Sequence, residues 1–184
     1  MSTLRTNQIQ TTGGAILVDS TGGIIQVVQR LSNAYGEIST PAMQNNNNDV
    51  QVPDYYVDIT TKRTNSRILV MMKNKLYGPN QQHQYVDIKR SVSGGGFTSL
   101  VTTYRTDATI DTFSGIHANA GGAFEGDYWT QIIDTPNVAA GTTLRYQQFY
   151  GSWAGGIMDY GGWDTLQNVN ARGLIVMQAM EIVA

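Results

Sequence analysis

Apolar and polar side chains alternate along several short stretches of the chain. Residues 55–60 place Tyr55, Val57 and Ile59 on one face. The same alternation recurs at residues 84–89 and, more weakly, at residues 143–150. Because successive side chains of a strand point to opposite faces, a period of two predicts half-buried β-strands. No stretch of a dozen residues keeps the apolar spacing of a helix, so we expect an all-β protein.

Two further stretches are apolar on both faces. Residues 67–73 are almost continuously apolar, which predicts a strand buried on both sides. Residues 173–183 predict a long apolar strand, whose two faces are more apolar than an edge strand of a lone sandwich should expose. Three copies of the chain around an axis would bury this excess, so we expect a homotrimer. The candidate interface residues share one face of that strand: Leu174, Val176, Met180 and Ile182.

Glycine-rich turns separate the expected strands. They lie at residues 77–82, 93–96, 120–122, 139–141 and 154–156. Short strands with turns at this density favour an antiparallel sandwich over alternating strands and helices. We therefore expect an antiparallel jelly-roll sandwich.

The first fifty residues differ from the rest of the chain. A Thr-Gly-Gly unit followed by an apolar strand occurs at residues 12–16 and again at 21–25. So small a segment buries too little apolar area to be stable alone. We expect residues 1–23 to be an extension for attachment and trimerisation, and residues 24–184 to be the jelly-roll domain, with 24–31 as its first strand. The polar tract at residues 44–49 predicts a loop that tolerates deletion.

Composition narrows the possible functions. The chain has 184 residues, a net charge of −2 and no cysteine, which excludes disulfides and thiolate metal sites. The chain has nearly equal numbers of basic and acidic residues, so it lacks the excess positive charge typical of nucleic-acid-binding proteins. No apolar run approaches the ~20 residues that a membrane-spanning helix needs, so we expect no membrane insertion.

Charge is distributed unevenly along the chain. Residues 64–105 hold six basic residues and one acidic residue, a net charge of +5. Residues 106–184 hold two basic and eight acidic residues, a net charge of −6. These regions either pair within one domain or form complementary surfaces between identical subunits.

Side chains with catalytic or metal-binding chemistry are sparse. His83 and His117 lie thirty-four residues apart and form no zinc-ligand spacing, so we expect surface or loop histidines. Two carboxylate pairs stand beside aromatic residues, Glu125 with Asp127 and Asp159 with Asp164. Such pairs serve glycoside hydrolysis only when they flank a cleft. We expect no enzyme activity, no metal and no cofactor; the one acid among residues 45–49 is too little charge for a tight calcium site.

Aromatic residues gather between residues 128 and 163. Within this region Gly-Gly pairs space Trp153, Tyr160 and Trp163, which suits loops better than core strands. Aromatic rings on loops serve as binding anchors and stack on sugars, and the neighbouring Asp159 and Asp164 could accept hydrogen bonds from sugar hydroxyls. These five residues are receptor-binding candidates; the alternative is that the rings cap the sandwich or fill a subunit interface.

Several stretches together resemble a known family. Residues 4–10, a Gly-Gly turn, and residues 15–18 and 24–28 resemble the N-terminal segment of small virion proteins of tailed bacteriophages, cyanophages especially. The following jelly-roll domain of those proteins is similar to five further stretches, at residues 57–62, 66–72, 134–137, 144–146 and 180–184.

The resemblance implies a trimeric jelly-roll component located in the virion. We expect a tail-fibre or tail-tip protein that attaches to a host surface glycan or protein; the alternative is a capsid cement protein that decorates and stabilises the head. A third hypothesis is an enzyme or lectin unrelated to virions. The N-terminal segment would bind other virion proteins of the tail, baseplate or capsid, with these attachment candidates: Leu4, Arg5, Asn7, Ile9, Ile16 and Leu17.

Overall fold

The computed structural model describes residues 8–10, 16–19, 23–34, 36–40, 49–78, 83–100, 114–117, 124–152, 156–160 and 175–183. Every regular element in these ranges is a strand. The strands are β1 (Gln8–Gln10), β2 (Ile16–Asp19), β3 (Ile24–Ser32), β4 (Gly36–Thr40), β5 (Val50–Thr60), β6 (Arg67–Gly78), β7 (His83–Val92), β8 (Phe97–Ser99), β9 (Ser114–His117), β10 (Phe124–Asp134), β11 (Thr143–Ser152), β12 (Gly156–Tyr160) and β13 (Ile175–Ile182).

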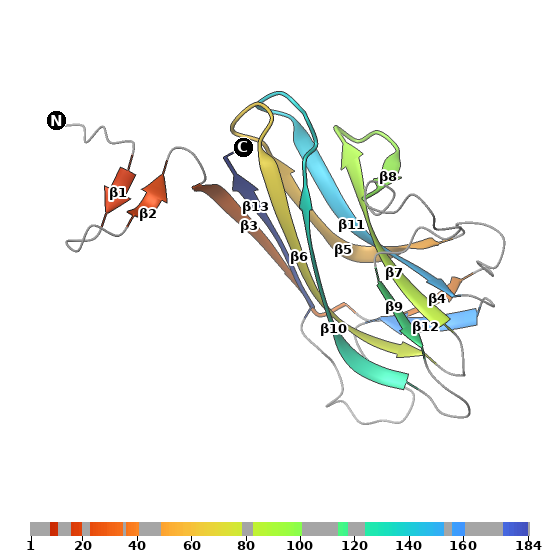
Figure 1. Ribbon diagram of the computed structural model, residues 1–184. Helices are drawn as coiled ribbons and strands as arrows, with labels where there is room; N and C mark the ends of the chain where they lie inside the picture. Colours follow the sequence, from red (N-terminus) through yellow and green to blue (C-terminus); the bar gives the residue numbers. More distant parts are fainter. Residues whose placement is uncertain are drawn as a thin grey trace.

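Two antiparallel sheets face each other (Figure 1). In the first sheet, β6 pairs with β10 along one edge and with β13 and then β12 along the other. β3 lies beyond β13, and β4 lies beyond β12. In the second sheet the order is β5, β11, β7 and β8, with β9 also paired to β7. The antiparallel β-sandwich expected from the sequence is confirmed.

The core lies between the inner faces of the two sheets. Tyr55, Val57 and Ile59 all point inward from β5, as their alternation predicts. The first sheet contributes Ile38, Ile68, Val70, Met72, Ile132, Ile175, Met177 and Ala179; the second adds Val52, Val86, Ile88, Leu144, Tyr146 and Tyr150.

β6 and β13 each bury only one face. In β6, Ile68, Val70 and Met72 are buried, whereas Leu69 and Met71 on the opposite face are only half-buried. The prediction of a strand buried on both faces is therefore wrong for residues 67–73. No further layer of the described chain covers this side of the first sheet. Burial within one copy of the chain therefore does not account for the apolar residues on the outward face of β6.

Buried polar groups join the two sheets at both ends of the core. Arg90 on β7 donates from Nη1 to both carboxylate oxygens of Asp134 on β10, at 2.7 and 2.8 Å. The Tyr146 hydroxyl on β11 donates to Asp134 at 2.7 Å. Burial and the Asp134 charge raise the pKa of Tyr146, which keeps this hydroxyl protonated. Elsewhere in the core, Asn74 donates to Gln148 across the sheets at 2.9 Å.

The last strand is held by a buried carboxylate. Glu181 accepts hydrogen bonds from the backbone N–H groups of Lys62 and Arg63 and from the Ser66 hydroxyl. The Gln26 amide on β3 also donates to it. Burial alone would raise the pKa of Glu181, but these hydrogen bonds hold it below the ordinary value. β13 is an interior strand between β3 and β6, not an edge strand, so its apolar outward face is not a consequence of an edge position.

β1 and β2 form a separate two-stranded sheet. Ile9 pairs with Val18, and Gln10 pairs with Ile16. Figure 1 shows this hairpin standing apart from the sandwich. The division of the chain at residue 23 stays a prediction.

Candidate interaction surfaces

The outward side of the first sheet is apolar across four strands. We call this surface the outer apolar face. Its residues are Ile24, Val27 and Leu31 on β3, Val176, Met180 and Ile182 on β13, Leu69 and Met71 on β6, and Trp129 and Ile133 on β10. Ile24, Val27, Leu31, Trp129 and Ile133 are between 44% and 63% exposed. Monomeric proteins rarely leave so many large apolar side chains together in water.

The register arranges this surface in rows. One row runs Leu31, Val176, Lys73, Trp129, and another runs Val27, Met180, Leu69, Ile133. Between them lies a row of amides, Gln29, Gln178 and Gln131, interrupted by Met71 on β6.

Two charged residues of β6 lie on its outward side, Lys73 in the middle of the strand and Arg67 at its start. Lys73 places its ammonium 5.5 Å from the centre of the Trp129 ring, and Arg67 ends the outward side at the start of the strand. A hollow of about 330 Å³ opens beside this ring, lined by Met71, Trp129, Thr130 and Gln131. The surface therefore combines exposed apolar side chains with a recess that can receive one.

Three of the four predicted interface residues share this face. Val176, Met180 and Ile182 are half-buried and point outward from β13, and Leu174 lies outside the described residues. Trp129, the most exposed of these side chains, belongs to the aromatic region at residues 128–163 but was not among the predicted interface residues. The signal was the alternation of Trp129, Gln131 and Ile133 along β10.

The outward side of the second sheet is polar and carries ion pairs between its strands. We call it the polar outer face. Arg145 on β11 donates to both oxygens of Asp58 on β5, at 2.7 and 2.8 Å. Lys89 on β7 contacts Asp49 at 2.6 Å, and its ammonium lies 4.7 Å from the Phe149 ring centre. Asp49 is thus part of an ion pair, so a deletion that includes it would break a contact that the loop prediction for residues 44–49 did not foresee.

The Tyr56 ring links this face to the edge of the first sheet. The guanidinium carbons of Arg145 and Arg30 lie 3.9 and 3.7 Å from the ring centre. Arg30 comes from β3 and pairs with Asp54 at 3.1 Å. Two Arg–Asp pairs therefore meet on one tyrosine ring, where β3 and β5 lie side by side.

Asp87 is a buried carboxyl on the outward side of β7. It is 2% exposed. Burial raises the pKa of Asp87 to about 7, and the Ser99 hydroxyl and the Lys89 charge offset only part of this effect. The carboxyl therefore changes charge near neutral pH.

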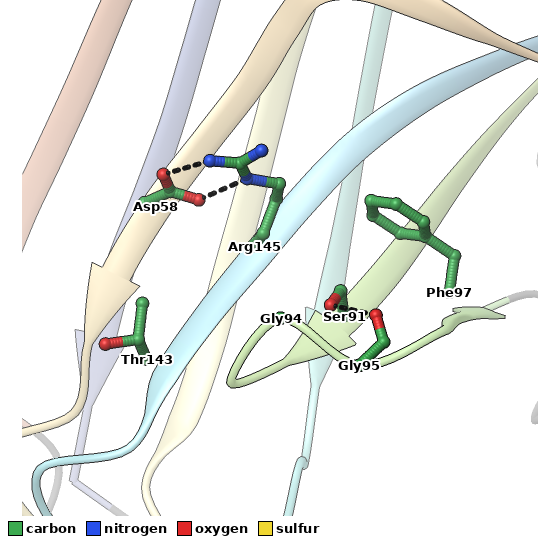
Figure 2. Close-up of a pocket in the computed structure, with 7 residues that line it drawn as sticks. All are labelled: Asp58, Ser91, Gly94, Gly95, Phe97, Thr143 and Arg145. Atoms are coloured by element: carbon green, nitrogen blue, oxygen red, sulfur yellow. Dashed lines mark hydrogen bonds and ion pairs between the residues drawn. The ribbon is translucent and has the colours of Figure 1, made fainter.

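A small cavity opens at the end of the polar outer face (Figure 2). It measures about 270 Å³ and is lined by Asp58, Ser91, Gly94, Gly95, Phe97, Thr143 and Arg145. Asp58, Arg145, Ser91 and Phe97 form one cross-strand row through β5, β11, β7 and β8. Residues 93–96, predicted as a turn, form the turn beside it. Sequence analysis did not single out this site.

One receptor-binding candidate can be placed in full. Tyr160 is half-buried, packs against the core and meets the Tyr55 ring edge to face at 5.1 Å. A Cβ at Gly36 would lie 2.7 Å from the Tyr160 hydroxyl, so glycine is required there. The ring therefore takes the packing role that the sequence left as the alternative. Asp159 lies on β12 opposite Glu37; Trp153, Trp163 and Asp164 lie outside the described residues.

The other predicted site residues are placed only by their strands. Ile9 lies in β1, Ile16 and Leu17 lie in β2, and Leu4, Arg5 and Asn7 lie outside the described residues. His83 and His117 are cross-strand partners in β7 and β9 and not loop residues. Glu125 and Asp159 both pair with Tyr77, from opposite sides of β6.

Metal and membrane features are absent from the part of the chain that the structure describes. There, no three His, Cys, Asp or Glu side chains gather as a metal site. The described ranges also contain no helix with the length and apolar content that crossing a bilayer requires.

Comparisons with known proteins give no family. No protein-family model matches the chain, and no curated protein matches it. One similar solved chain belongs to the structure of infectious bursal disease virus, Gx strain, with a TM-score of 0.36 and 11% identity. The alignment covers 98% of this chain and 42% of that chain, so this chain spans less than half of its length. This similarity is too low to define the fold or the function.

Proposed function

We propose that the chain is a non-enzymatic structural protein of a virion, a trimeric tail-fibre or tail-tip component that mediates attachment to the host surface. The exposed outer apolar face of the first sheet carries the assembly part of this proposal. The virion part rests on the sequence resemblance described above. A capsid cement protein is the alternative that uses the same assembly surface.

The strand order supports a jelly roll as the fold of residues 24–184. After β4 the chain passes through β5, β6, β7, β8, β10, β11 and β13. Each of these strands lies in the opposite sheet from the strand named before it, except that β8 follows β7 in the same sheet. The resulting orders are β3, β13, β6, β10 in one sheet and β5, β11, β7, β8 in the other. Two interleaved four-strand sets of this kind support a jelly roll, an architecture that viral capsid and lectin domains use.

A second copy of the chain is the partner that best fits the outer apolar face. Its middle row carries amides, Gln29, Gln178 and Gln131, each of which both donates and accepts hydrogen bonds. Three copies around an axis would bring the amides and apolar rows of neighbouring copies together, so polar groups can meet polar groups and apolar side chains can meet apolar side chains. Arg67 stands at the start of β6, where an interface has its polar rim, whereas Lys73 lies within the face, between Val176 and Trp129.

The size of the face agrees with this partner. Four strands ~4.8 Å apart and about eight residues long at ~3.3 Å each cover roughly 500 Å² in plan. The accessible area of a corrugated surface is larger than its plan. Small specific interfaces bury about 600 Å² on each partner, so the face is close to the area that stable association needs.

The position of the protein on the particle tests the proposed role. Antibodies raised against the purified protein are labelled with gold, applied to virions purified from cells that express it and imaged by electron microscopy. Label at the end of the tail supports the tail-fibre or tail-tip assignment. Label spread over the head overturns that assignment in favour of the cement protein. Virions without any label would contradict both.

A further inference from the structure

The cavity on the polar outer face has a fixed backbone. Ser93 and Gly94 both have positive φ, 49° and 78°, as the tight type I′ hairpin turn between β7 and β8 requires. Gly95 N–H donates to Val92 at 2.9 Å, and Ser93 N–H donates to the Thr143 carbonyl on β11 at 2.8 Å. The Ser91 hydroxyl donates to the Gly95 carbonyl at 2.7 Å. A ligand would meet a turn that is already ordered, which lowers the entropy lost on binding.

The polar wall of the cavity is a preformed donor–acceptor pair. Figure 2 shows the Arg145 guanidinium held flat against the Asp58 carboxylate by two hydrogen bonds. Both side chains are 40% exposed. Arginine has five N–H donors and a carboxylate accepts about four hydrogen bonds, so each group keeps capacity for a ligand. The pair offers donors and acceptors within one small area.

The opposite wall is apolar. The Phe97 ring is held by an edge-to-face contact with Phe149, with ring centres 5.1 Å apart. Ser91 lies between Phe97 and Arg145 in the cross-strand row, and Gly94 and Gly95 line the cavity with exposed backbone and no side chains. An aromatic surface facing hydrogen-bonding groups suits a ligand with an apolar face and hydroxyl groups at its edge.

We propose that this cavity binds one unit of a neutral saccharide. Sugar rings have C–H faces that can pack on Phe97 and hydroxyls that can both donate to Asp58 and accept from Arg145. An anion is disfavoured because the Asp58 carboxylate already neutralises Arg145. At about 270 Å³ the cavity is smaller than sites for drug-sized ligands, which are about 300–1,000 Å³, so it suits a single sugar unit.

This inference deepens the attachment role proposed above, because it names a ligand class and a site for it. It assigns ligand binding to the polar outer face, opposite the face proposed for assembly. Binding of a free sugar can be measured whatever the oligomeric state or the location on a particle. If no sugar binds, the assembly proposal is unaffected. If the protein is monomeric, sugar binding to this cavity can still be measured.

Saturation-transfer NMR on the full chain tests the proposal. The probes are free glucose, galactose, mannose and N-acetylglucosamine, with glucuronate and inorganic phosphate as charged comparisons. We expect at least one neutral sugar to give a signal, and D58N/R145Q to weaken its binding at least tenfold. The matched control is D54N/R30Q, because that Arg–Asp pair contacts the same Tyr56 ring but does not line the cavity. It should bind the sugar as the native protein does.

A second variant covers the case in which D58N/R145Q does not fold. Phe97→Leu keeps an apolar side chain but removes the ring, and it should weaken sugar binding at least fivefold. The proposal is overturned if no neutral sugar gives a signal, if glucuronate or phosphate binds more tightly than every neutral sugar, or if a folded D58N/R145Q or Phe97→Leu protein binds as tightly as the control.

Discussion

The two sheets of the sandwich have outer faces of opposite chemistry. On the second sheet, Arg145 pairs with Asp58 and Lys89 pairs with Asp49, so the polar groups there contact one another. On the first sheet, Val27, Leu31 and Trp129 are each about half exposed to water. An antiparallel sheet with one face on the core normally presents a polar face to solvent. The second sheet follows this rule, and the first breaks it in the way that a subunit interface does.

Free energy supports this interpretation of the difference. The whole face, amide row included, covers roughly 500 Å² in plan, so at ~25 cal/mol/Å² covering it is favourable by at most about 12 kcal/mol for each copy. Association costs about 4–15 kcal/mol in lost freedom. The outer apolar face can therefore drive assembly, whereas the polar outer face gains little from being covered.

The largest effect should come from breaking the link between the two sheets. Asp134→Ala leaves the Arg90 guanidinium without its carboxylate inside the sandwich, which should cost about 3–5 kcal/mol. Chemical denaturation of the native and variant proteins measures this loss. The control is Asp58→Ala on the polar outer face, which removes an exposed Arg–Asp pair and should cost ~1 kcal/mol or less. Equal losses for the two variants would show that the interior pair has no special role.

Asp87 should make the polar outer face sensitive to pH. Its carboxyl is protonated in the folded protein up to about pH 7, whereas in the unfolded chain it ionises near its ordinary value of 3.8. The folded state therefore loses stability as the pH rises from about 4 to 7, and the loss is complete above pH 7. Asp87→Asn removes this cost and should stabilise the protein by ~2–4 kcal/mol at pH 8 and by much less at pH 4.

Denaturation of native and Asp87→Asn proteins at pH 4, 6 and 8 measures this difference. The control is Asp58→Asn, whose carboxyl is 40% exposed. Because exposed ion pairs contribute about 0–1 kcal/mol, its effect should stay within ~1 kcal/mol at each pH. A stabilisation by Asp87→Asn that is equal at all three values would rule out the ionisation of Asp87 as the cause.

Charges on the outer apolar face should abolish assembly without unfolding the sandwich. V27K/L31K places two ammonium groups among the exposed apolar rows. We expect the concentration for half-dissociation to rise at least a hundredfold. Sedimentation measures dissociation, and far-UV circular dichroism should be unchanged. Val92→Lys is the control, because Val92 is also exposed but lies in the second sheet; if it dissociates the protein equally, the face is not the interface.

The smallest effect on stability should come from removing residues 1–23. Among the described contacts of this segment with the sandwich is the hydrogen bond from Val183 N–H to the Gly23 carbonyl at 3.1 Å. Its loss should cost about 1 kcal/mol. The truncated protein should unfold nearly as the full chain does but fail to enter the particle. A truncated chain that does not fold would place the segment in the core.

The sequence predicted the strands better than the surfaces. Alternation located β5 and the inward position of Tyr55, because the period of two follows from strand geometry alone. It also placed Val176 and Met180 together on an outward face. It failed for residues 67–73, because a continuous apolar run has the same pattern whether its second face meets a further layer or an exposed surface.

The cavity could not be predicted from the sequence. Asp58, Ser91 and Arg145 lie far apart in the chain, and only the register of β5, β11 and β7 brings them into one row. Turn composition located residues 93–96, but not the hydrogen bonds that fix them. Likewise, the sequence placed Tyr160 among possible binding rings, and its contact with Tyr55 depends on tertiary packing.

Light scattering on the purified full chain, coupled to size-exclusion chromatography, tests the central claim that the two outer faces differ because copies of the chain cover one of them. At micromolar concentration the measured mass should be three times the chain mass of 20.1 kDa. A single species of 20.1 kDa at that concentration would contradict the claim, because the outer apolar face would then be exposed in the stable protein.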